Sequence, residues 1–376
     1  MSQTTTKTHI FLTGATGEAL LCYIGGSVLT RLLNHKLSDT FEITVLVRNA
    51  EKAEKLKTLG VNAVIGSNED IAILKRLATE ADIVIASADA DDLAAAQAIL
   101  DGLKERYERT GQVPSLLHTS GTGVVIDNAR GMHSTDKVYS DLDDASIAAI
   151  DINQPHRNVD AAIVEADAKG DFISRYSLLN FIDDFTVLGY IKSYIILPST
   201  IYGAASGTLV DIGVQNAYSQ QIPALVKLSL QRGKAGIFGP GKNLWPNVHI
   251  DDVTDLYLLI LEKILPNNGN SDSLVPGHGA SGYYFGENGE HALYSVGKAI
   301  AQAMYDLGKT DTTEPVSFTE EEVRNFPPTL IMALGTNSRC KADRARSLGW
   351  KPTRTTEDML SSVKDEVERL VGHKAK

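Results

Sequence analysis

The feature that most constrains the fold is a glycine-rich turn between a short apolar run and a helix-like segment. Residues 9–13 form the run, Gly14-Ala15-Thr16-Gly17 follows directly, and Gly25-Gly26 lies near the start of the helix-like segment. Glycine lets the backbone turn sharply and a pyrophosphate approach closely, while a helix N-terminus offers free N–H groups and a positive dipole end. In this context the turn predicts a phosphate-binding loop; the alternative is a tight turn without a ligand.

Short β-branched runs alternate with helix-like segments through the first 120 residues. Strands separated by helices of this length indicate right-handed βαβ units and a parallel sheet. A further helix at 156–169 and a strand at 193–197 continue the pattern, which predicts an α/β, Rossmann-type doubly wound parallel sheet. The strands are expected at 9–13, 42–47, 61–65, 82–86 and 115–119, and the helices at 24–34, 50–59, 69–79 and 92–109.

The pattern also suggests how the chain is divided. Residues 1–203 are expected to form the dinucleotide-binding domain. Residues 204–376 mix helices with Gly/Pro-rich turns and form mainly a smaller substrate-binding lobe, with 245–262 returning to the Rossmann core. The polar stretch 121–155 is expected to be a surface loop with one short helix.

Composition limits the partners. The formal net charge of -11 disfavours nucleic-acid binding, which depends on Lys and Arg neutralising phosphates. No uncharged apolar run approaches the length of about 18 residues that a membrane span needs, and residues 1–9 lack the apolar core of a signal peptide. Cys22 and Cys340 are too few for a disulfide framework and fit no metal-ligand spacing. We therefore expect a cytoplasmic protein without a metal site.

The residue type at the end of the second strand indicates whether the cofactor is NAD or NADP. An acidic residue there would accept a hydrogen bond from the ribose 2′-hydroxyl of NAD, but the sequence reads Val47-Arg48-Asn49. Arg48 could instead pair with a 2′-phosphate, so NADP is favoured over NAD. The alternative is that Arg48 is only a solvated surface charge.

The ordered segments TGATG…YIGGSVL, ADIVIAS, LLHTSGTG, ILPSTIYG and WPNVHIDDVTDLY resemble the landmarks of extended short-chain dehydrogenase/reductases, which include NAD-dependent epimerases and dehydratases. GYYFGENGEHALYSVGKAI and SRCKADRARSLGWKP are similar to that family's final helices. The resemblance covers nearly the whole chain. It implies a dinucleotide in the N-terminal crevice, a small-molecule substrate held by the C-terminal lobe, and a homodimer through helices 92–109 and 156–169.

The resemblance also implies roles for individual residues. The phosphates would meet the turn and the helix start, and the ribose and nicotinamide would lie along the next strand ends. The residues implied in cofactor binding are Gly14, Thr16, Gly17, Tyr23, Ile24, Gly25, Arg48, Ala86, Ser87, Thr119, Pro198 and Ser199.

The chain departs from the family where the chemistry should lie. The family uses a Tyr and a Lys four residues apart on one helix face, but here these positions hold His156 and Asp160. Three interpretations compete. His156 could replace Tyr as the proton donor, with Asp160 orienting it and Ser120 assisting. The site could bind a dinucleotide without redox chemistry, or His156 could simply cap or pack the helix. Tyr294 and Lys298 match the spacing but lie too far along the chain to be the pair.

Two insertions also depart from the family. Residues 18–22 separate the turn from Tyr23 and bring Glu18 near the phosphates; if they loop out the site survives, and if they extend the helix it is damaged. Residues 171–189 hold three of the nine phenylalanines. They are either a lid or interface helix or a retained intron. We hypothesise the intron, and a mature transcript that always keeps these codons would refute it.

The sequence thus predicts an NAD(P)-dependent oxidoreductase or a nucleoside-diphosphate-sugar epimerase/dehydratase-like enzyme acting on a small metabolite. The alternative is a non-catalytic NADP-binding sensor or scaffold, which the missing Tyr and Lys favour. A third interpretation is an accessory protein without a cofactor.

Overall fold

A computed structural model describes residues 7–16, 20–169, 189–265 and 274–373. Its centre is a seven-stranded sheet, β11-β7-β5-β4-β1-β2-β3, in which all neighbouring strands are parallel. The sequence therefore predicted the fold class correctly. The strands are β1 (Thr8–Thr13), β2 (Phe41–Val47), β3 (Asn62–Ile65), β4 (Ile83–Ala86), β5 (Ser115–Thr119), β7 (Lys192–Pro198) and β11 (Tyr283–Gly286).

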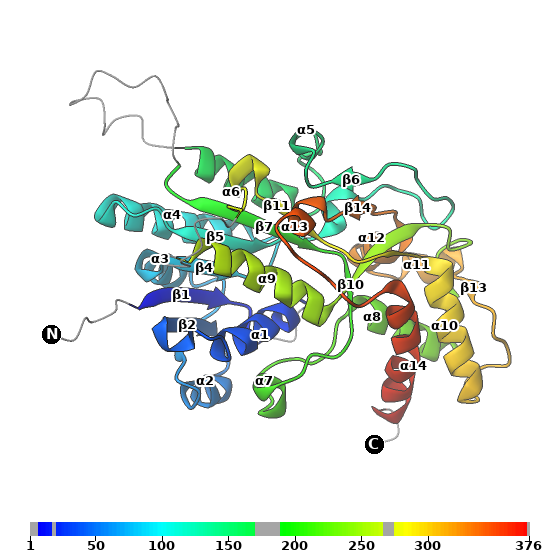
Figure 1. The fold of residues 1–376 in the computed structure, drawn as a ribbon. Helices are drawn as coiled ribbons and strands as arrows, with labels where there is room; N and C mark the ends of the chain where they lie inside the picture. Colours follow the sequence, from blue (N-terminus) through cyan, green and yellow to red (C-terminus); the bar gives the residue numbers. More distant parts are fainter. Residues whose placement is uncertain (1–6, 17–19, 170–188, 266–273, 374–376) are drawn as a thin grey trace.

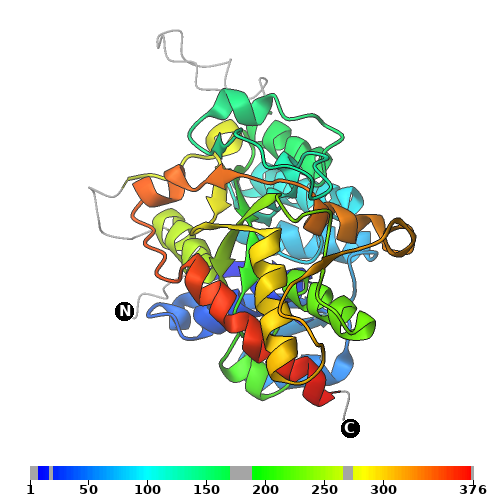
Figure 2. The ribbon, with the colours of Figure 1, turned by 90° about the vertical axis from the view of Figure 1, so that its right-hand side faces the viewer.

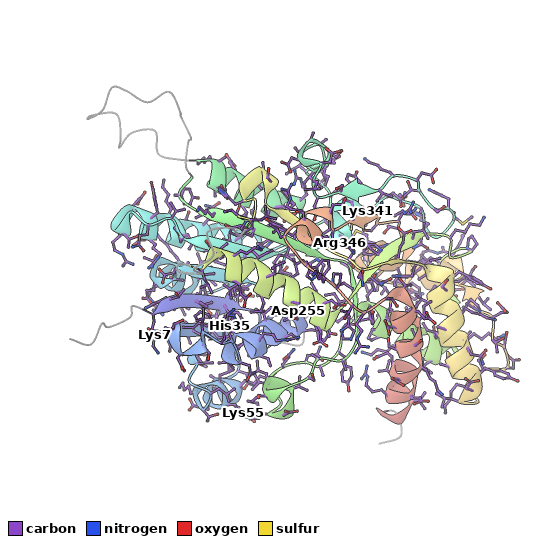
Figure 3. All side chains as sticks on the ribbon, in the orientation of Figure 1. Lys7, His35, Lys55, Asp255, Lys341 and Arg346 are labelled. Carbon is purple, nitrogen blue, oxygen red and sulfur yellow. The ribbon has the colours of Figure 1, made fainter. Side chains whose placement is uncertain are left out.

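Helices cover both faces of this sheet (Figure 1), which explains why its central strands are nearly continuous apolar runs. One face carries α3 (Ile71–Glu80), α4 (Leu93–Thr110) and α6 (Arg157–Ala168). The other carries α1 (Leu20–Leu33) and α9 (Ile250–Ile264), which lie side by side and are joined at the surface by the ion pair Arg31–Asp255. Figure 3 labels Asp255 on α9 and His35 just after α1. Helix α2 (Ala50–Lys57) links β2 to β3.

Local signals fix the ends of several helices. The Asp92 carboxylate accepts a hydrogen bond from the Ala95 N–H at 2.9 Å and caps the start of α4, as short polar side chains do at helix N-termini. Gly111 ends the same helix with φ of 68°, in the left-handed conformation that glycine adopts without steric cost. The sequence prediction for this helix was therefore accurate to one residue.

Three sequence expectations were wrong in detail. Helix α1 begins at Leu20, not at residue 24, because Leu20–Cys22 continue the helix with residues that favour it. Stretch 121–155 is not only a surface loop: it forms a 3₁₀ turn at Thr122–Val125, the short strand β6 (Tyr139–Ser140) and helix α5 (Asp144–Ala148). The segment GYYF, expected in a terminal helix, contains β11, the seventh strand, which pairs with β7.

The C-terminal half builds a second hydrophobic core. It contains α8 (Gln221–Arg232), α10 (Leu293–Asp306) and α14 (Thr356–His373), and Figure 2 shows α10 and α14 side by side. A three-stranded sheet, β12-β10-β8, joins the halves through β8 (Thr200–Tyr202), β10 (Leu244–His249) and β12 (Glu290–Ala292). The remaining elements are α7 (Thr208–Asp211), β9 (Gly236–Ile237), β13 (Val316–Ser317), α11 (Glu320–Arg324), α12 (Pro328–Gly335), β14 (Cys340–Lys341) and α13 (Asp343–Ser347), with 3₁₀ turns at Ser38–Thr40 and Gly279–Ser281.

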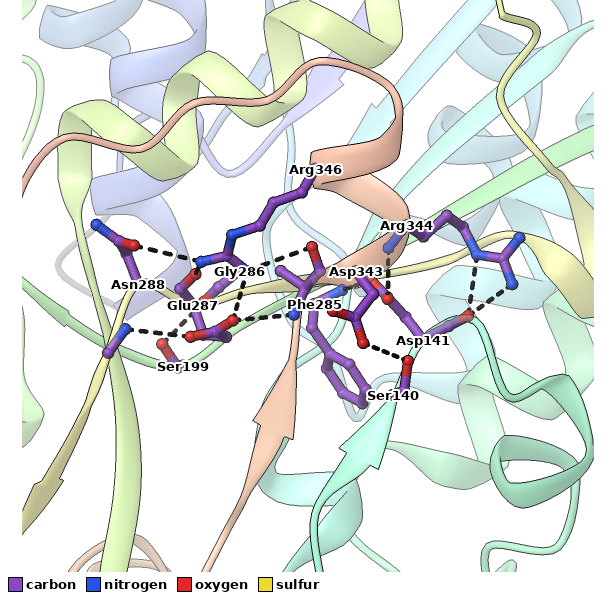
Figure 4. A network of polar contacts seen from close by, with 12 residues as sticks. Ser140, Asp141, Ser199, Phe285, Gly286, Glu287, Asn288, Asp343, Arg344 and Arg346 are labelled. Carbon is purple, nitrogen blue, oxygen red and sulfur yellow. Dashed lines mark hydrogen bonds and ion pairs between the residues drawn. The ribbon is translucent and has the colours of Figure 1, made fainter.

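A buried polar network fastens the C-terminal segment to the sheet edge (Figure 4). The Asp141 carboxylate accepts hydrogen bonds from the Phe285 N–H at 3.0 Å and the Arg344 N–H at 2.7 Å, and the Glu287 carboxylate pairs with the Arg346 guanidinium at 2.6 Å. Burial raises the pKa of Asp141 to about 7. Because Ser199 donates to the Gly286 carbonyl at 2.8 Å, the same network holds the strand end next to the crevice.

No helix among these described residues combines the length and apolar character needed to cross a bilayer.

Candidate functional site: a dinucleotide crevice and an Asp–His pair

The crevice lies where the strand order reverses, between the carboxyl ends of β1 and β4. In open α/β sheets this switch point is where ligands bind. Gly14 has φ of +80°, and a Cβ atom there would lie 2.0 Å from the Ser87 carbonyl oxygen. Gly25 is equally constrained, because a Cβ atom on it would lie 2.5 Å from the Gly14 carbonyl oxygen. Both positions therefore need glycine for the turn to pack between the strand end and the helix.

The inserted residues change the start of the helix. Because α1 begins at Leu20, its first free N–H groups belong to inserted residues, and not to Tyr23 and Ile24 as the resemblance implied. Both of these side chains are fully buried, and the Tyr23 hydroxyl donates to the Gly203 carbonyl at 2.6 Å. Of the two alternatives for the insertion, helix extension holds for Leu20–Cys22. The damage to the phosphate site that was expected with helix extension stays a prediction, which the NADPH titration below tests. Gly17 and Glu18 lie outside the described residues.

A cavity of about 290 Å³ opens beside this turn. Arg48 is exposed after the end of β2, lines this cavity and forms no ion pair with any described residue. Lys52 donates to the Thr16 carbonyl at 2.8 Å and fixes the turn from the other side. Acidic side chains share the rim, and the Asp92 carboxylate is already used as a helix cap. The cavity is lined by Thr13, Gly14, Thr16, Cys22, Leu46, Arg48, Gly66, Ser67, Asn68, Glu69, Ala88, Asp89 and Asp92.

These residues fit the adenosine end of a dinucleotide: two glycines bring the backbone close, a helix begins at the turn, and a cation lies beyond the second strand. The expected contacts at the nicotinamide end are less direct. Ser87 and Thr119 are fully buried, and the Thr119 hydroxyl donates to Ser87 at 3.1 Å. A hydroxyl–hydroxyl bond of 2.6 Å joins Thr119 to Tyr257 on α9. These hydroxyls bond one another across the strand ends, which differs from the free ribose contacts that the resemblance implied.

Other predicted cofactor residues lie at the same edge of the sheet. Ala86 is partly exposed at the end of β4, and Pro198 is buried at the end of β7. Ser199 follows Pro198 and is 7% exposed. The structure therefore brings these three residues to the crevice edge, and their contacts with a cofactor remain predictions.

His156 occupies the position just before α6 with φ of 66°. A left-handed conformation is costly for a residue with a side chain, by about 1–3 kcal/mol, and such strain clusters at functional sites. Within the described part of the chain, its side chain makes no capping hydrogen bond to α6. His156 is therefore the N-cap residue of α6 by position but does not cap the helix with its side chain; the interpretation that it only packs against this helix is not contradicted. Its ring is only partly exposed, at 22%.

Asp91, which sequence reasoning missed, holds this histidine. One carboxylate oxygen of Asp91 accepts from the His156 backbone N–H at 3.0 Å and lies 2.7 Å from ring Nδ1. The hydrogen bond from His156 lowers the pKa of Asp91. The acidic run Asp89–Asp92 after the fourth strand was the available signal, because strand ends of one parallel sheet meet at the same edge.

The other ring nitrogen of His156 points toward a glycine pair in the β5 loop. Cβ atoms built on Gly121 and Gly123 would lie 3.3 Å and 3.1 Å from Nε2. Because glycine leaves this space free, the imidazole fits against the loop that follows Thr119. With Nδ1 donating to a carboxylate, Nε2 is left to accept or donate a proton.

Asp160 does not pair with His156, contrary to the first interpretation. Its side chain is fully buried on α6 and accepts from the Ser120 hydroxyl at 3.0 Å. Burial raises the pKa of Asp160 to about 7. Among the described residues, Asp160 Oδ1 and His118 Nε2 lack hydrogen-bond partners and lie 3.9 Å apart. Burial lowers the pKa of His118 to about 3, so that ring is neutral.

Tyr294 and Lys298 belong to α10 in the C-terminal core, where both side chains contact Glu314. Their exclusion from the catalytic pair agrees with this placement.

Fold and site together define a dinucleotide-binding protein of the Rossmann class. A family profile described as NAD(P)H-binding matches residues 14–165. The chain is 31% identical to the protein named Oxidase ucsJ of an Acremonium species, over 96% of this chain and 98% of that protein. It is 25% identical to Uncharacterized protein C2A9.02 of Schizosaccharomyces pombe, over 93% and 96%. The chain belongs to the same family as the Acremonium protein and has an NAD(P)-binding domain, which agrees with the resemblance to extended short-chain dehydrogenase/reductases.

Solved structures show the same fold. UDP-glucose 4-epimerase of Thermotoga maritima, solved with UDP-glucose, superposes with a TM-score of 0.59 at 16% identity, over 97% of this chain and 100% of that one. The dTDP-glucose 4,6-dehydratase of Bacillus anthracis, solved with NAD, gives a TM-score of 0.59 at 15% identity, over 96% and 97%.

Proposed function

We propose that the protein is an NADP-dependent oxidoreductase of a small metabolite in which His156, held by Asp91, replaces the family's Tyr. The observation that carries this proposal is the Asp91–His156 pair beside the β5 loop. It supplies an oriented imidazole at the helix start where the family places its acid–base group. The relative named an oxidase supports the same general class.

The cofactor preference is proposed from Arg48. NADP, when bound, accepts or supplies the hydride. The turn at Gly14 and Thr16 would hold the phosphates, and Arg48 would pair with the 2′-phosphate. Since a guanidinium binds phosphate through several charge-assisted hydrogen bonds, it selects for this group.

His156 would move the substrate's proton. The Asp91 carboxylate keeps a proton on Nδ1 and stabilises the imidazolium, so that Nε2 donates a proton during reduction and accepts one during oxidation. Ser120 does not contact His156 in the structure; it lies beneath, bonded to Asp160. We assign Ser120 and Asp160 to positioning the β5 loop against α6.

A specific observation favours a second function, a non-catalytic NADP-binding sensor. The family places a Lys where Asp160 is buried, and a buried carboxyl cannot supply the cation that holds the nicotinamide ribose. In that function His156 and Asp91 would only brace the loop.

Cofactor titration separates these functions. NADPH and NADH binding would be measured by calorimetry for the wild type, His156→Ala and Asp91→Asn. NADPH oxidation would then be followed on aliphatic and aromatic ketones, aldehydes and UDP-glucose. Turnover that is lost in His156→Ala with binding retained supports the enzyme. Binding by all three proteins without turnover on the panel favours the sensor, and absence of NADPH and NADH binding by the wild type refutes both.

A further inference from the structure

A groove of about 590 Å³ lies beside the proposed proton donor. One wall comes from the β5 loop and the residues before α6, including Ile126 and Pro155, and the other comes from α12. Pro155 directly precedes His156. A Cβ atom on Gly123 would touch both residues, at 3.7 Å from Pro155 Cβ and 3.1 Å from His156 Nε2. The volume is typical of a small-molecule site.

The exposed surface of the groove is largely apolar, although polar side chains such as Asn153 and Gln154 share its lining. Helix α12 contributes Pro328, Ile331 and Met332, and Met332 is 37% exposed. An apolar helix face left open to solvent beside a polar crevice is typical of a ligand-binding surface. Together with Ile126 and Pro155, these side chains form the apolar part of the lining.

The charge of the groove is as informative as its apolar surface. Arg130 is the one basic side chain in its described lining. Asp127 also lines the groove, but its carboxylate already accepts hydrogen bonds from Asn337. The backbone and side-chain N–H groups of Asn337 donate to it at 2.8 Å each. A nucleoside diphosphate carries at least two negative charges and needs several cationic or N–H donors. The side-chain amides of Asn153 and Gln154 in the lining already donate to Asp151 and to the Ile126 carbonyl. Arg130, on a chain of net charge -11, therefore matches at most one acidic group.

The backbone at Arg130 supports a binding role for this residue. Arg130 has φ of 50°, and it precedes Gly131, where a Cβ atom would lie 1.8 Å from the Phe238 carbonyl oxygen. The Arg130 side chain bonds locally to Asn128 at 3.3 Å. Backbone strain of this kind clusters at functional sites, so the left-handed conformation of Arg130 at the rim of the groove is consistent with ligand binding there.

We propose that this groove binds the substrate of the proposed reaction, and that the substrate is a largely apolar molecule with no more than one acidic group and not a sugar nucleotide. The inference rests on the proposed function for the link to catalysis. The kind of molecule that is expected to bind is inferred from the groove alone. It separates this chain from the structural neighbours that were solved with sugar nucleotides.

The probe we would use is 8-anilinonaphthalene-1-sulfonate, an aromatic molecule with a single sulfonate. We expect one saturable site on the wild type by fluorescence and calorimetry. Met332→Glu and Ile331→Glu should each weaken it at least about tenfold, because a carboxylate is costly to bury against an apolar ligand. The matched control is Ile71→Glu, which changes an isoleucine that is 41% exposed on α3 and should leave binding unchanged. Circular dichroism and thermal melting would verify the fold of each variant.

UDP-glucose is the competing probe. We expect millimolar UDP-glucose to leave the fluorescence of the bound dye unchanged. Displacement of the dye by UDP-glucose, or equal dye affinity in the wild type and both folded α12 variants, would overturn the inference. The experiment needs neither cofactor nor turnover, so a failure of the proposed catalysis is visible separately as the absence of NADPH oxidation.

Discussion

The carboxylate of Asp91 holds His156 through two groups, the backbone N–H at 3.0 Å and ring Nδ1 at 2.7 Å. This contact joins the end of β4 to the start of α6 across the mouth of the crevice. It fixes both the backbone conformation and the ring orientation of the histidine, and leaves Nε2 beside the β5 loop. In the proposed function this pair takes the place of the family's tyrosine as the group that moves the substrate's proton.

The first prediction concerns the titration of Asp91. Since the hydrogen bond from His156 lowers the pKa of Asp91, His156→Ala should raise that pKa toward its ordinary value. The measurement is carboxyl-carbon NMR of labelled protein. An unchanged Asp91 titration in the variant would show that the bond is weak in solution.

The same shift predicts a pH dependence of stability. A carboxyl with a lowered pKa stabilises the fold above the ordinary pKa near 3.8, and this contribution is lost as the pH falls through the lowered value. The Asp91 side chain is 62% exposed, so solvent screens the interaction and the contribution is about 1 kcal/mol or less. Urea unfolding should show His156→Ala closest to the wild type below pH 3.

The second prediction concerns the buried Asp160. Its pKa is raised to about 7, so the folded state favours the protonated form. The sign is the reverse of that for Asp91: stability is fully present below the ordinary pKa near 3.8 and is lost as the pH rises toward 7. Asp160→Asn should therefore gain stability relative to the wild type between pH 4 and pH 8.

Thermal melting across this range, with the exposed Asp211→Asn as control, measures the effect. Ser120 donates to the carboxylate and can still donate to the Asn carbonyl oxygen, so the variant keeps this contact. A wild type and an Asp160→Asn variant whose difference does not change with pH would contradict the assignment of a buried, protonated carboxyl.

The third prediction uses the close approach of Gly25 to Gly14. A methyl group on Gly25 would lie 2.5 Å from the Gly14 carbonyl oxygen, so Gly25→Ala should displace the turn. We expect a loss of about 1–3 kcal/mol in unfolding free energy and weaker NADPH binding. The control is Gly372→Ala in α14, where a Cβ atom meets nothing within 4 Å and alanine should stabilise the helix by roughly 0.5–1 kcal/mol. Equal stability of Gly25→Ala and the wild type would count against the packed turn.

The sheet could be predicted from the sequence because its strands and helices alternate with clear periods. The seventh strand could not, because Tyr283–Gly286 is short and pairs with β7, which is distant in the chain. The start of α1 was expected at residue 24, and the sequence left open whether the inserted residues loop out or extend the helix; Leu20 and Leu21 favour a helix, and α1 begins at Leu20. The helix propensity of the inserted residues, and not the family's spacing, therefore sets the start of α1.

The candidate site was predictable in part. The sequence showed the departure at His156 because this residue stands at the position of the family's Tyr. Its partner was not, because Asp91 lies 65 residues away in the chain and only the three-dimensional sheet edge brings the two together. Asp160 was expected to pair with His156 four residues earlier, but its side chain points to the buried side of α6, where Ser120 is its partner.

The last prediction tests the cofactor through Arg48. This side chain lines the cavity at the turn, is exposed, and has no ion-pair partner among the described residues. If it binds a 2′-phosphate, Arg48→Ala should weaken NADPH binding by roughly tenfold or more, since a charge-assisted hydrogen bond contributes about 1.5–3 kcal/mol. NADH, which lacks this phosphate, should bind the variant and the wild type equally.

Calorimetric titration with NADPH and with NADH gives the ratio of the two affinities directly. Arg76→Ala is the matched control, because Arg76 is an exposed arginine on α3 that contacts Glu80. If Arg48→Ala weakens NADPH and NADH to the same extent, Arg48 acts on the shared adenosine or pyrophosphate and does not select the phosphate. If neither affinity changes, Arg48 is a solvated charge, and Glu69 and Asp89 on the cavity rim become the groups to test for ribose hydroxyl binding and a preference for NAD.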